Sequence, residues 1–86
     1  MDTLTGMRLF NKVAETGSFS AAGRAIGLAP SSVSRQISAL EDQLGTRLFN
    51  RTTRKLHLTE AGEIYHGHTE RILSNIEEAN AAVTEL

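Results

Sequence analysis

Two short stretches of the chain hold side chains that can make polar contacts to a larger ligand. In the first, Ser31, Ser34, Arg35 and Ser38 fall on one face of a helix at about 100° per residue. Serine hydroxyls can hydrogen-bond phosphates or base edges, and an arginine can fork onto the O6 and N7 of a guanine for about 1–3 kcal/mol of discrimination. The second stretch, residues 51–55, places three cations in five positions and suits a phosphate backbone or a narrow minor groove. These residue types predict contacts to a nucleic acid.

An enzyme or a metal site is a competing interpretation of the polar residues. His66 and His68 are two positions apart, so they do not share a helix face, and Glu63 or Glu70 would be a weak third ligand. The sequence has no Ser-His-Asp order, no glycine-rich phosphate loop and no convergent acid pair. We therefore expect no catalysis, no metal and no cofactor.

The overall charge argues against a nucleic-acid binder, but its distribution argues for one. The chain has 9 Lys+Arg against 10 Asp+Glu, a net charge of -1 and a pI near 6.3, whereas nucleic-acid-binding domains often have a pI above about 9. However, residues 24–58 carry six cations and two acids, and residues 59–86 carry one cation and six acids. The positive excess coincides with the polar stretches.

The length and composition indicate one small domain. The chain has 86 residues and no cysteine, so neither a disulfide nor a thiolate zinc site reinforces its core. An acidic second residue and the lack of a long apolar run predict neither a secretory signal nor a membrane span, and a cytoplasmic location is expected.

Apolar periodicity predicts three helices in the first half. The first carries the apolar series of residues 4–14, with Asp2 or Thr3 as its N-cap, and ends at residues 16–18. The second covers residues 21–26 with Ser20 as its N-cap, and the third starts at Pro30 and stops at Gly45. The apolar stripe of the third helix anchors it on the other two; its members are Val33, Ile37, Leu40 and Leu44.

The spacing of the apolar residues changes twice in the second half of the chain. Residues 47–58 read as two short strands, Leu48-Phe49 and Leu56–Leu58, around a basic tip. A helix capped by Thr59 then covers residues 59–86 and is about 42 Å long. Its apolar seam either folds back on the chain or pairs with a second copy, and we expect a dimer because the helix outreaches the body. The expected dimer residues are Tyr65, His68, Ile72, Ile76, Ala79 and Val83.

Together these elements predict a mainly α fold of the winged helix-turn-helix type. Residues 1–58 would form the domain, a three-helix core plus a β-hairpin wing, with the helix-turn-helix at about 19–38 and the wing at about 47–58. Residues 59–86 would form a long C-terminal dimerisation helix. In such folds the helix that carries the exposed polar face enters the major groove.

Several sequence runs resemble the N-terminal DNA-binding region of LysR-type transcriptional regulators. They are FSAA at 19–22, AIGL at 25–28, PSSVSRQI at 30–37, LE at 40–41, LG at 44–45, LF at 48–49, RTTR at 51–54 and LTEAG at 58–62. The resemblance covers the whole chain. One departure is Ala29, where the family often has Ser or Gln, so a side-chain contact at that position is not carried over.

The resemblance implies a bacterial, nucleoid-associated regulator that binds operator DNA. It also implies dimerisation through antiparallel linker helices, usually within a tetramer, and a C-terminal inducer-binding domain that this chain lacks, so we expect an isolated DNA-binding fragment. A winged-helix module that binds other proteins without touching DNA is the alternative. The expected DNA contacts are Pro30, Ser31, Ser32, Ser34, Arg35, Gln36, Ser38, Arg51, Thr52, Thr53, Arg54 and Lys55.

Overall fold

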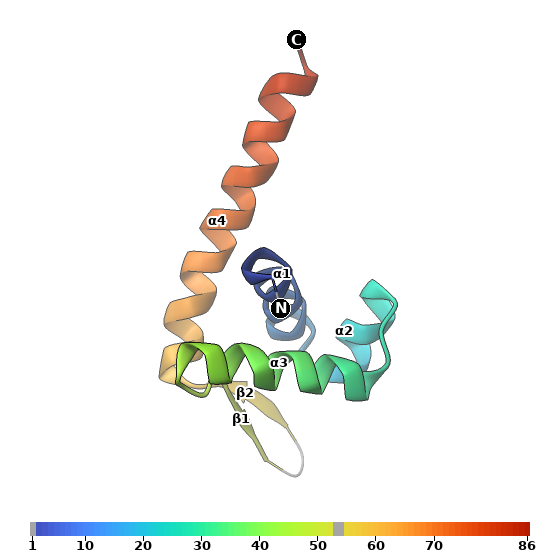
Figure 1. Ribbon diagram of the computed structural model, residues 1–86, viewed down its shortest axis with the longest axis vertical. Coiled ribbons are helices and arrows are strands. Elements are labelled where there is room, and N and C mark those ends of the chain that lie inside the picture. Colours follow the sequence, from blue (N-terminus) through green and yellow to red (C-terminus); the bar gives the residue numbers. More distant parts are fainter. Residues whose placement is uncertain (1, 53–54) are drawn as a thin grey trace.

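The computed structural model describes residues 2–52 and 55–86, which form helices and one hairpin (Figure 1). The predicted fold class, a mainly α winged helix-turn-helix with a long C-terminal helix, is confirmed. The elements in chain order are α1 (Thr3–Thr16), α2 (Phe19–Ile26), α3 (Pro30–Leu44), β1 (Phe49–Arg51), β2 (Leu56–Leu58) and α4 (Glu60–Thr84).

The ends of α1 and α3 follow local signals in the sequence. Asp2 caps α1, since its carboxylate accepts the N–H of Thr5 at 3.1 Å and the Thr5 hydroxyl at 2.9 Å. The hydroxyl bond and then the amide bond hold the pKa of the Asp2 carboxyl below its ordinary 3.8. Pro30 opens α3, and Gly45 ends it with a left-handed φ of 71°.

The cap of α2 differs from the prediction. Ser18, and not Ser20, is the N-cap: it has extended backbone angles and its hydroxyl accepts the N–H of Ala21 at 3.2 Å. Starting the helix at Phe19 lets that ring pack against the core, 6.4 Å from the ring of Phe49. Tertiary packing therefore selects between two serines that are equally good caps.

The hairpin is a short antiparallel ribbon. Phe49 pairs with Leu58, and Arg51 pairs with Leu56. Its first strand starts at Phe49, one residue later than predicted, because Leu48 is in the core and its carbonyl accepts the N–H of Thr59 at 2.9 Å.

The core lies where the three N-terminal helices, the hairpin and the start of α4 meet. Phe10 is its centre: its ring lies 5.3 Å from that of Phe49 and 5.1 Å from that of Tyr65. Leu44, predicted in the buried stripe of α3, is 43% exposed because it lies in the last turn of the helix. The buried apolar residues are Leu9, Phe10, Val13, Ala22, Val33, Ile37, Leu40, Leu48 and Phe49.

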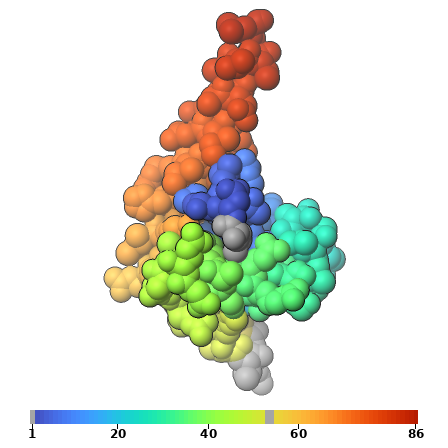
Figure 2. Space-filling view, viewed as in Figure 1, coloured from blue at the N-terminus to red at the C-terminus, as the bar shows by residue number. Residues whose placement is uncertain are grey.

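The first half of α4 packs on α1 and on the hairpin, and its C-terminal part projects from the body (Figures 1 and 2). Thr59 caps it as predicted, accepting the N–H of Gly62 at 2.9 Å. Gly62 is buried, and a Cβ built there would overlap the carbonyl oxygen of Leu48. Glycine at this position thus permits the close approach of α4 to the start of the hairpin.

Gly62→Ala is expected to destabilise the chain. The added methyl must displace backbone at Leu48, so we expect the free energy of unfolding to fall by about 1–3 kcal/mol in urea denaturation followed by circular dichroism. Gly67→Ala is the matched control on the same helix. Its Cβ would meet Arg71 at 4.0 Å, so better helix propensity should raise the stability by up to about 1 kcal/mol. Equal changes in stability in Gly62→Ala and Gly67→Ala would contradict the close approach of α4 to the backbone at Leu48.

Candidate nucleic-acid interface

The polar face of α3 lies opposite its buried stripe. Pro30, Ser31 and Arg35 are exposed, and the remaining predicted contacts of α3 are partly buried; these are Ser32, Ser34, Gln36 and Ser38. Ser31 and Arg35 lie on the accessible side of α3, opposite the side that Val33 and Ile37 hold in the core.

The beginning of α3 favours an anion. Ala29 occupies the N-cap and has no side-chain acceptor, and the first turn carries no acidic residue. The amide groups and the positive end of the helix dipole at this position are therefore not neutralised by a carboxylate. Arg35 adds a full positive charge one turn further on. Its guanidinium donates to the Ser32 hydroxyl at 3.3 Å, an exposed bond that water can replace.

The hairpin wing extends below α3 in Figure 1. Its turn is closed by Thr52, whose N–H and hydroxyl donate to the carbonyl of Lys55 at 3.2 and 2.9 Å. Thr52 and Lys55 are exposed, so both are accessible to a phosphate backbone. Thr53 and Arg54 lie outside the described residues.

Arg51 makes more contacts with its own chain than its place in the wing suggests. Its guanidinium donates to Ser38 at 3.2 Å and to Glu41 at 3.3 Å, and it lies 5.1 Å from the centre of the Phe19 ring. The side chain is 33% exposed. One predicted contact of the wing and one of α3, Arg51 and Ser38, are thus bonded to each other.

Glu41 is the functional residue that the sequence reasoning missed. It is 3% exposed, and one carboxylate oxygen accepts the backbone N–H groups of Leu48 at 2.8 Å and Phe49 at 3.2 Å. The other oxygen accepts from Arg47 at 3.4 Å and from Arg51 at 3.3 Å. Glu41 lies four residues after the buried Ile37, on the same side of α3, and this spacing is the signal that indicates burial.

The predicted seam of α4 divides into two parts. Tyr65 packs against Phe10 in the core of its own chain, and this burial raises the pKa of the Tyr65 phenol above its ordinary 10.0. Ile76 is partly buried. The rest of the seam is exposed and remains available to a partner: His68, Ile72, Ala79 and Val83.

A buried polar contact, also unforeseen, joins α1 to α4. Thr69 is fully buried and donates its hydroxyl to the side-chain oxygen of Asn11. Nearby, His66 lies edge-on to Phe10, with ring centres 6.0 Å apart. These contacts fix the direction in which α4 leaves the body.

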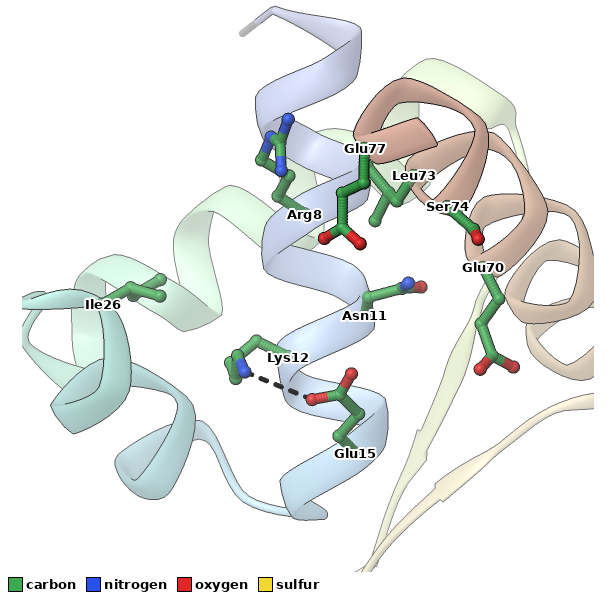
Figure 3. Close-up of a pocket in the computed structure, with 9 residues that line it drawn as sticks. All are labelled: Arg8, Asn11, Lys12, Glu15, Ile26, Glu70, Leu73, Ser74 and Glu77. Carbon is green, nitrogen blue, oxygen red and sulfur yellow. Dashed lines mark hydrogen bonds and ion pairs between the residues drawn. The ribbon is translucent and has the colours of Figure 1, made fainter. Parts of the chain in front are cut away.

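A groove of ≈ 390 Å³ between α1 and α4 is lined by none of the predicted DNA contacts (Figure 3). Charges of both signs line it, among them Arg8, Glu70 and Glu77, and Lys12 pairs with Glu15 at 3.2 Å. Within residues 2–52 and 55–86, no group of three His, Cys, Asp or Glu residues is placed to hold a metal ion. No helix in the same residues is long and apolar enough to cross a membrane.

The three-helix core, the exposed face of α3 and the wing define a winged helix-turn-helix protein. The family model described as bacterial regulatory helix-turn-helix protein, lysR family, matches residues 4–63, from α1 to the first turn of α4. The chain belongs to this family.

Curated relatives carry the same family type in their names. An HTH-type transcriptional regulator of Xanthomonas campestris pv. campestris (strain 8004) is 51% identical over 78 residues, which cover 91% of this chain and 23% of that protein. The HTH-type transcriptional activator AaeR of Escherichia coli (strain K12) is 44% identical over 80 residues, covering 93% and 26%. The chain spans about a quarter of the length of these relatives.

Solved structures extend the likeness to the whole chain. The BenM DNA-binding domain in a complex with catB site 1 DNA has a TM-score of 0.92 at 30% identity, covering 99% of this chain and 93% of that one. The CbnR DNA-binding domain in a DNA complex has a TM-score of 0.87 at 29% identity, covering 99% and 97%. The predicted family is confirmed by these matches.

Glu41→Gln is expected to weaken the junction between α3 and the wing. The amide can no longer accept from both backbone N–H groups and both arginines, so buried donors lose their partner. We expect a fall of about 1–3 kcal/mol in the free energy of unfolding measured in urea. The neighbouring Asp42 is exposed, and Asp42→Asn should stay within about 0.5 kcal/mol of wild type. A Glu41→Gln chain as stable as Asp42→Asn would show that the carboxylate does not hold the junction.

Proposed function

We propose that this chain binds a specific two-fold-symmetric operator as a dimer, with α3 in the major groove and the wing along the backbone or in the minor groove. The observation that carries this proposal is the exposed polar face of α3, with Arg35 at its centre and Val33 and Ile37 buried behind it. A helix anchored on one side and polar on the other can enter the groove without unfolding the core.

Base reading is assigned to Arg35 and to Ser31 and Ser34 beside it. Arg35 is exposed, and its bond to Ser32 is easily exchanged, so the guanidinium can turn toward a guanine. Phosphate binding is assigned to Lys55 and Thr52 in the wing and to the amide groups at the beginning of α3. These contacts fix the register of the protein on the duplex, and the base contacts supply the specificity.

Dimerisation is assigned to the exposed apolar stripe of α4. Ile72 is 38% exposed and Val83 is 69% exposed, although both lie on one side of the helix together with Ala79. The C-terminal part of α4 extends beyond the body (Figure 2). Pairing with a second copy of α4 would bury Ile72, Ala79 and Val83 and would place two α3 helices on one face of the duplex.

The remaining assignments follow from DNA binding. We infer a cytoplasmic location beside the nucleoid, because that is where bacterial operators lie. We also infer that the chain is not an enzyme and needs no cofactor, since its family consists of regulatory helix-turn-helix proteins. An inducer would bind to a C-terminal domain of a longer regulator, and assembly of two dimers into a tetramer would also belong to that longer protein.

Arg35→Ala tests the assignment of base reading. Binding is measured by mobility shift on a duplex selected from a random library with the wild-type chain, and on a scrambled duplex of the same composition. We expect the substitution to weaken binding to the selected duplex by about 1–3 kcal/mol and to leave binding to the scrambled duplex unchanged. Arg8→Ala is the control, because Arg8 lies in the groove between α1 and α4, and it should bind both duplexes like the wild type.

The salt dependence of DNA binding by the wild-type chain tests the proposal as a whole. If about 6–8 phosphates are neutralised per dimer, log K should fall against log salt with a slope of about −5 to −7. If Arg35→Ala loses affinity for both duplexes equally, Arg35 contacts the DNA backbone and not a base. A slope near zero, or no selected sequence, would instead favour a module that binds proteins.

Val83→Asp tests the dimer. A buried charge should oppose pairing of the α4 stripes, so sedimentation should show a dimeric wild type at micromolar concentration and a largely monomeric variant. Ala81→Asp introduces the same charge two residues away, on the opposite side of the helix, and should remain dimeric. A stable wild-type monomer under these conditions, or equal dissociation of both variants, would contradict the assigned interface.

A further inference from the structure

The side chain of Arg51 is shared by three elements of the interface. It starts from the end of β1, bonds Ser38 at 3.2 Å and Glu41 at 3.3 Å on α3, and lies 5.1 Å from the ring centre of Phe19 at the start of α2. A planar guanidinium with several fixed donors can bridge two acceptors while its face lies on an aromatic ring. An ammonium group cannot reproduce all three contacts.

Arg47 provides a comparison within the same chain. It bonds the same Glu41 oxygen at 3.4 Å, but its side chain is 72% exposed against 33% for Arg51. Ion pairs that are open to water contribute little. The two arginines therefore share a carboxylate, but Arg51 is the one built into the junction of the helix-turn-helix with the wing.

Glu41 extends this junction to the backbone. Its second oxygen holds the N–H groups of Leu48 and Phe49, where the chain enters β1. Both the start of the strand and the side chain at its end are therefore fixed to α3 through one carboxylate. The strand cannot pivot against α3 without breaking a buried charged hydrogen bond.

We propose that Glu41, Arg51 and Ser38 are positioning residues that lock the wing to the recognition helix and thereby set how well the protein discriminates its operator. The proposal rests on the proposed DNA binding. Arg51 and Ser38 act on DNA through the placement of Thr52 and Lys55 and not by touching bases. This differs from the direct contacts that their positions in the sequence predict.

The physical reason is the cost of ordering the wing. A wing already fixed in its bound orientation loses little conformational entropy on binding, whereas a free wing must be ordered by the DNA. Binding to a specific site requires α3 and the wing to fit one register, while non-specific binding is satisfied by phosphates in many placements. Loosening the junction should therefore weaken specific binding more than non-specific binding.

Arg51→Lys is the decisive variant, because it keeps the positive charge and removes the planar fork. The probes are a duplex selected from a random library with the wild-type chain and its scrambled counterpart. We expect affinity for the selected duplex to fall about tenfold, the effect of one charge-assisted hydrogen bond. Affinity for the scrambled duplex and the salt slope should stay as in wild type. Arg47→Lys, which alters the same carboxylate from its exposed side, should bind both duplexes like wild type.

Two further variants separate positioning from direct contact. The double variant Glu41→Gln, Arg51→Lys should lose no more discrimination between the two duplexes than the more affected of the two single variants loses. Both changes loosen the same junction, so their effects should not add. Ser38→Ala, which removes one partly exposed hydroxyl, should weaken selected binding mildly. It should also select the same sequence from the random library as wild type does. Circular dichroism on each variant confirms that it is folded at the temperature of the titration.

The outcomes divide clearly. If Arg51→Lys discriminates between the two duplexes as well as the wild type does, the proposal is overturned, because the positive charge alone then suffices. Additive losses of discrimination in the double variant would also overturn it. A Ser38→Ala chain that loses preference at a single base pair would make Ser38 a base reader and would also overturn it. If the wild-type chain binds neither duplex, the proposed DNA binding itself fails, and that result is distinct from every variant outcome above.

Discussion

The arrangement of the interface depends on one buried carboxylate. Glu41 lies at the edge of the core, where an unpaired charge would be very costly, and its oxygens are occupied by two backbone N–H groups and two guanidinium groups. These partners come from the segment that leaves α3 and enters the hairpin. The end of α3 and the strand β1 are consequently joined through one side chain, in addition to the apolar contacts of Phe49, Leu56 and Leu58 with the core.

Much of this fold could be predicted because its signals are local. Pro30 and Gly45 bracket α3, and the spacing of Val33, Ile37 and Leu40 identifies its buried side. The predictions failed where distant packing decides the outcome. Ser18 and Ser20 have equal capping ability, and only the packing of Phe19 against the core selects Ser18. Leu44 fits the apolar spacing of α3, but it lies in the last turn and is exposed.

The candidate site divides in the same way. The residue types on α3 and the excess of cations in residues 24–58 are visible in the sequence, so a candidate nucleic-acid interface could be predicted from it. The partners of individual side chains were not. Arg51 meets Ser38 across a hairpin, Tyr65 turns toward Phe10, and Thr69 meets Asn11 58 residues away along the chain. Such contacts depend on how helices cross, and residue spacing does not encode that.

The continuity of α4 has a consequence for how such a chain can change over time. An α-helix turns about 100° and rises about 1.5 Å with each residue. Tyr65 and Thr69 fix the rotational phase of the helix against α1, and Ile72 to Val83 inherit that phase. A single inserted residue between these two groups would turn the apolar stripe by more than a quarter of a circle. Apolar substitutions within the stripe are therefore tolerable, whereas insertions and deletions are restricted to lengths such as about seven or about eleven residues, which restore the phase to within about 20°.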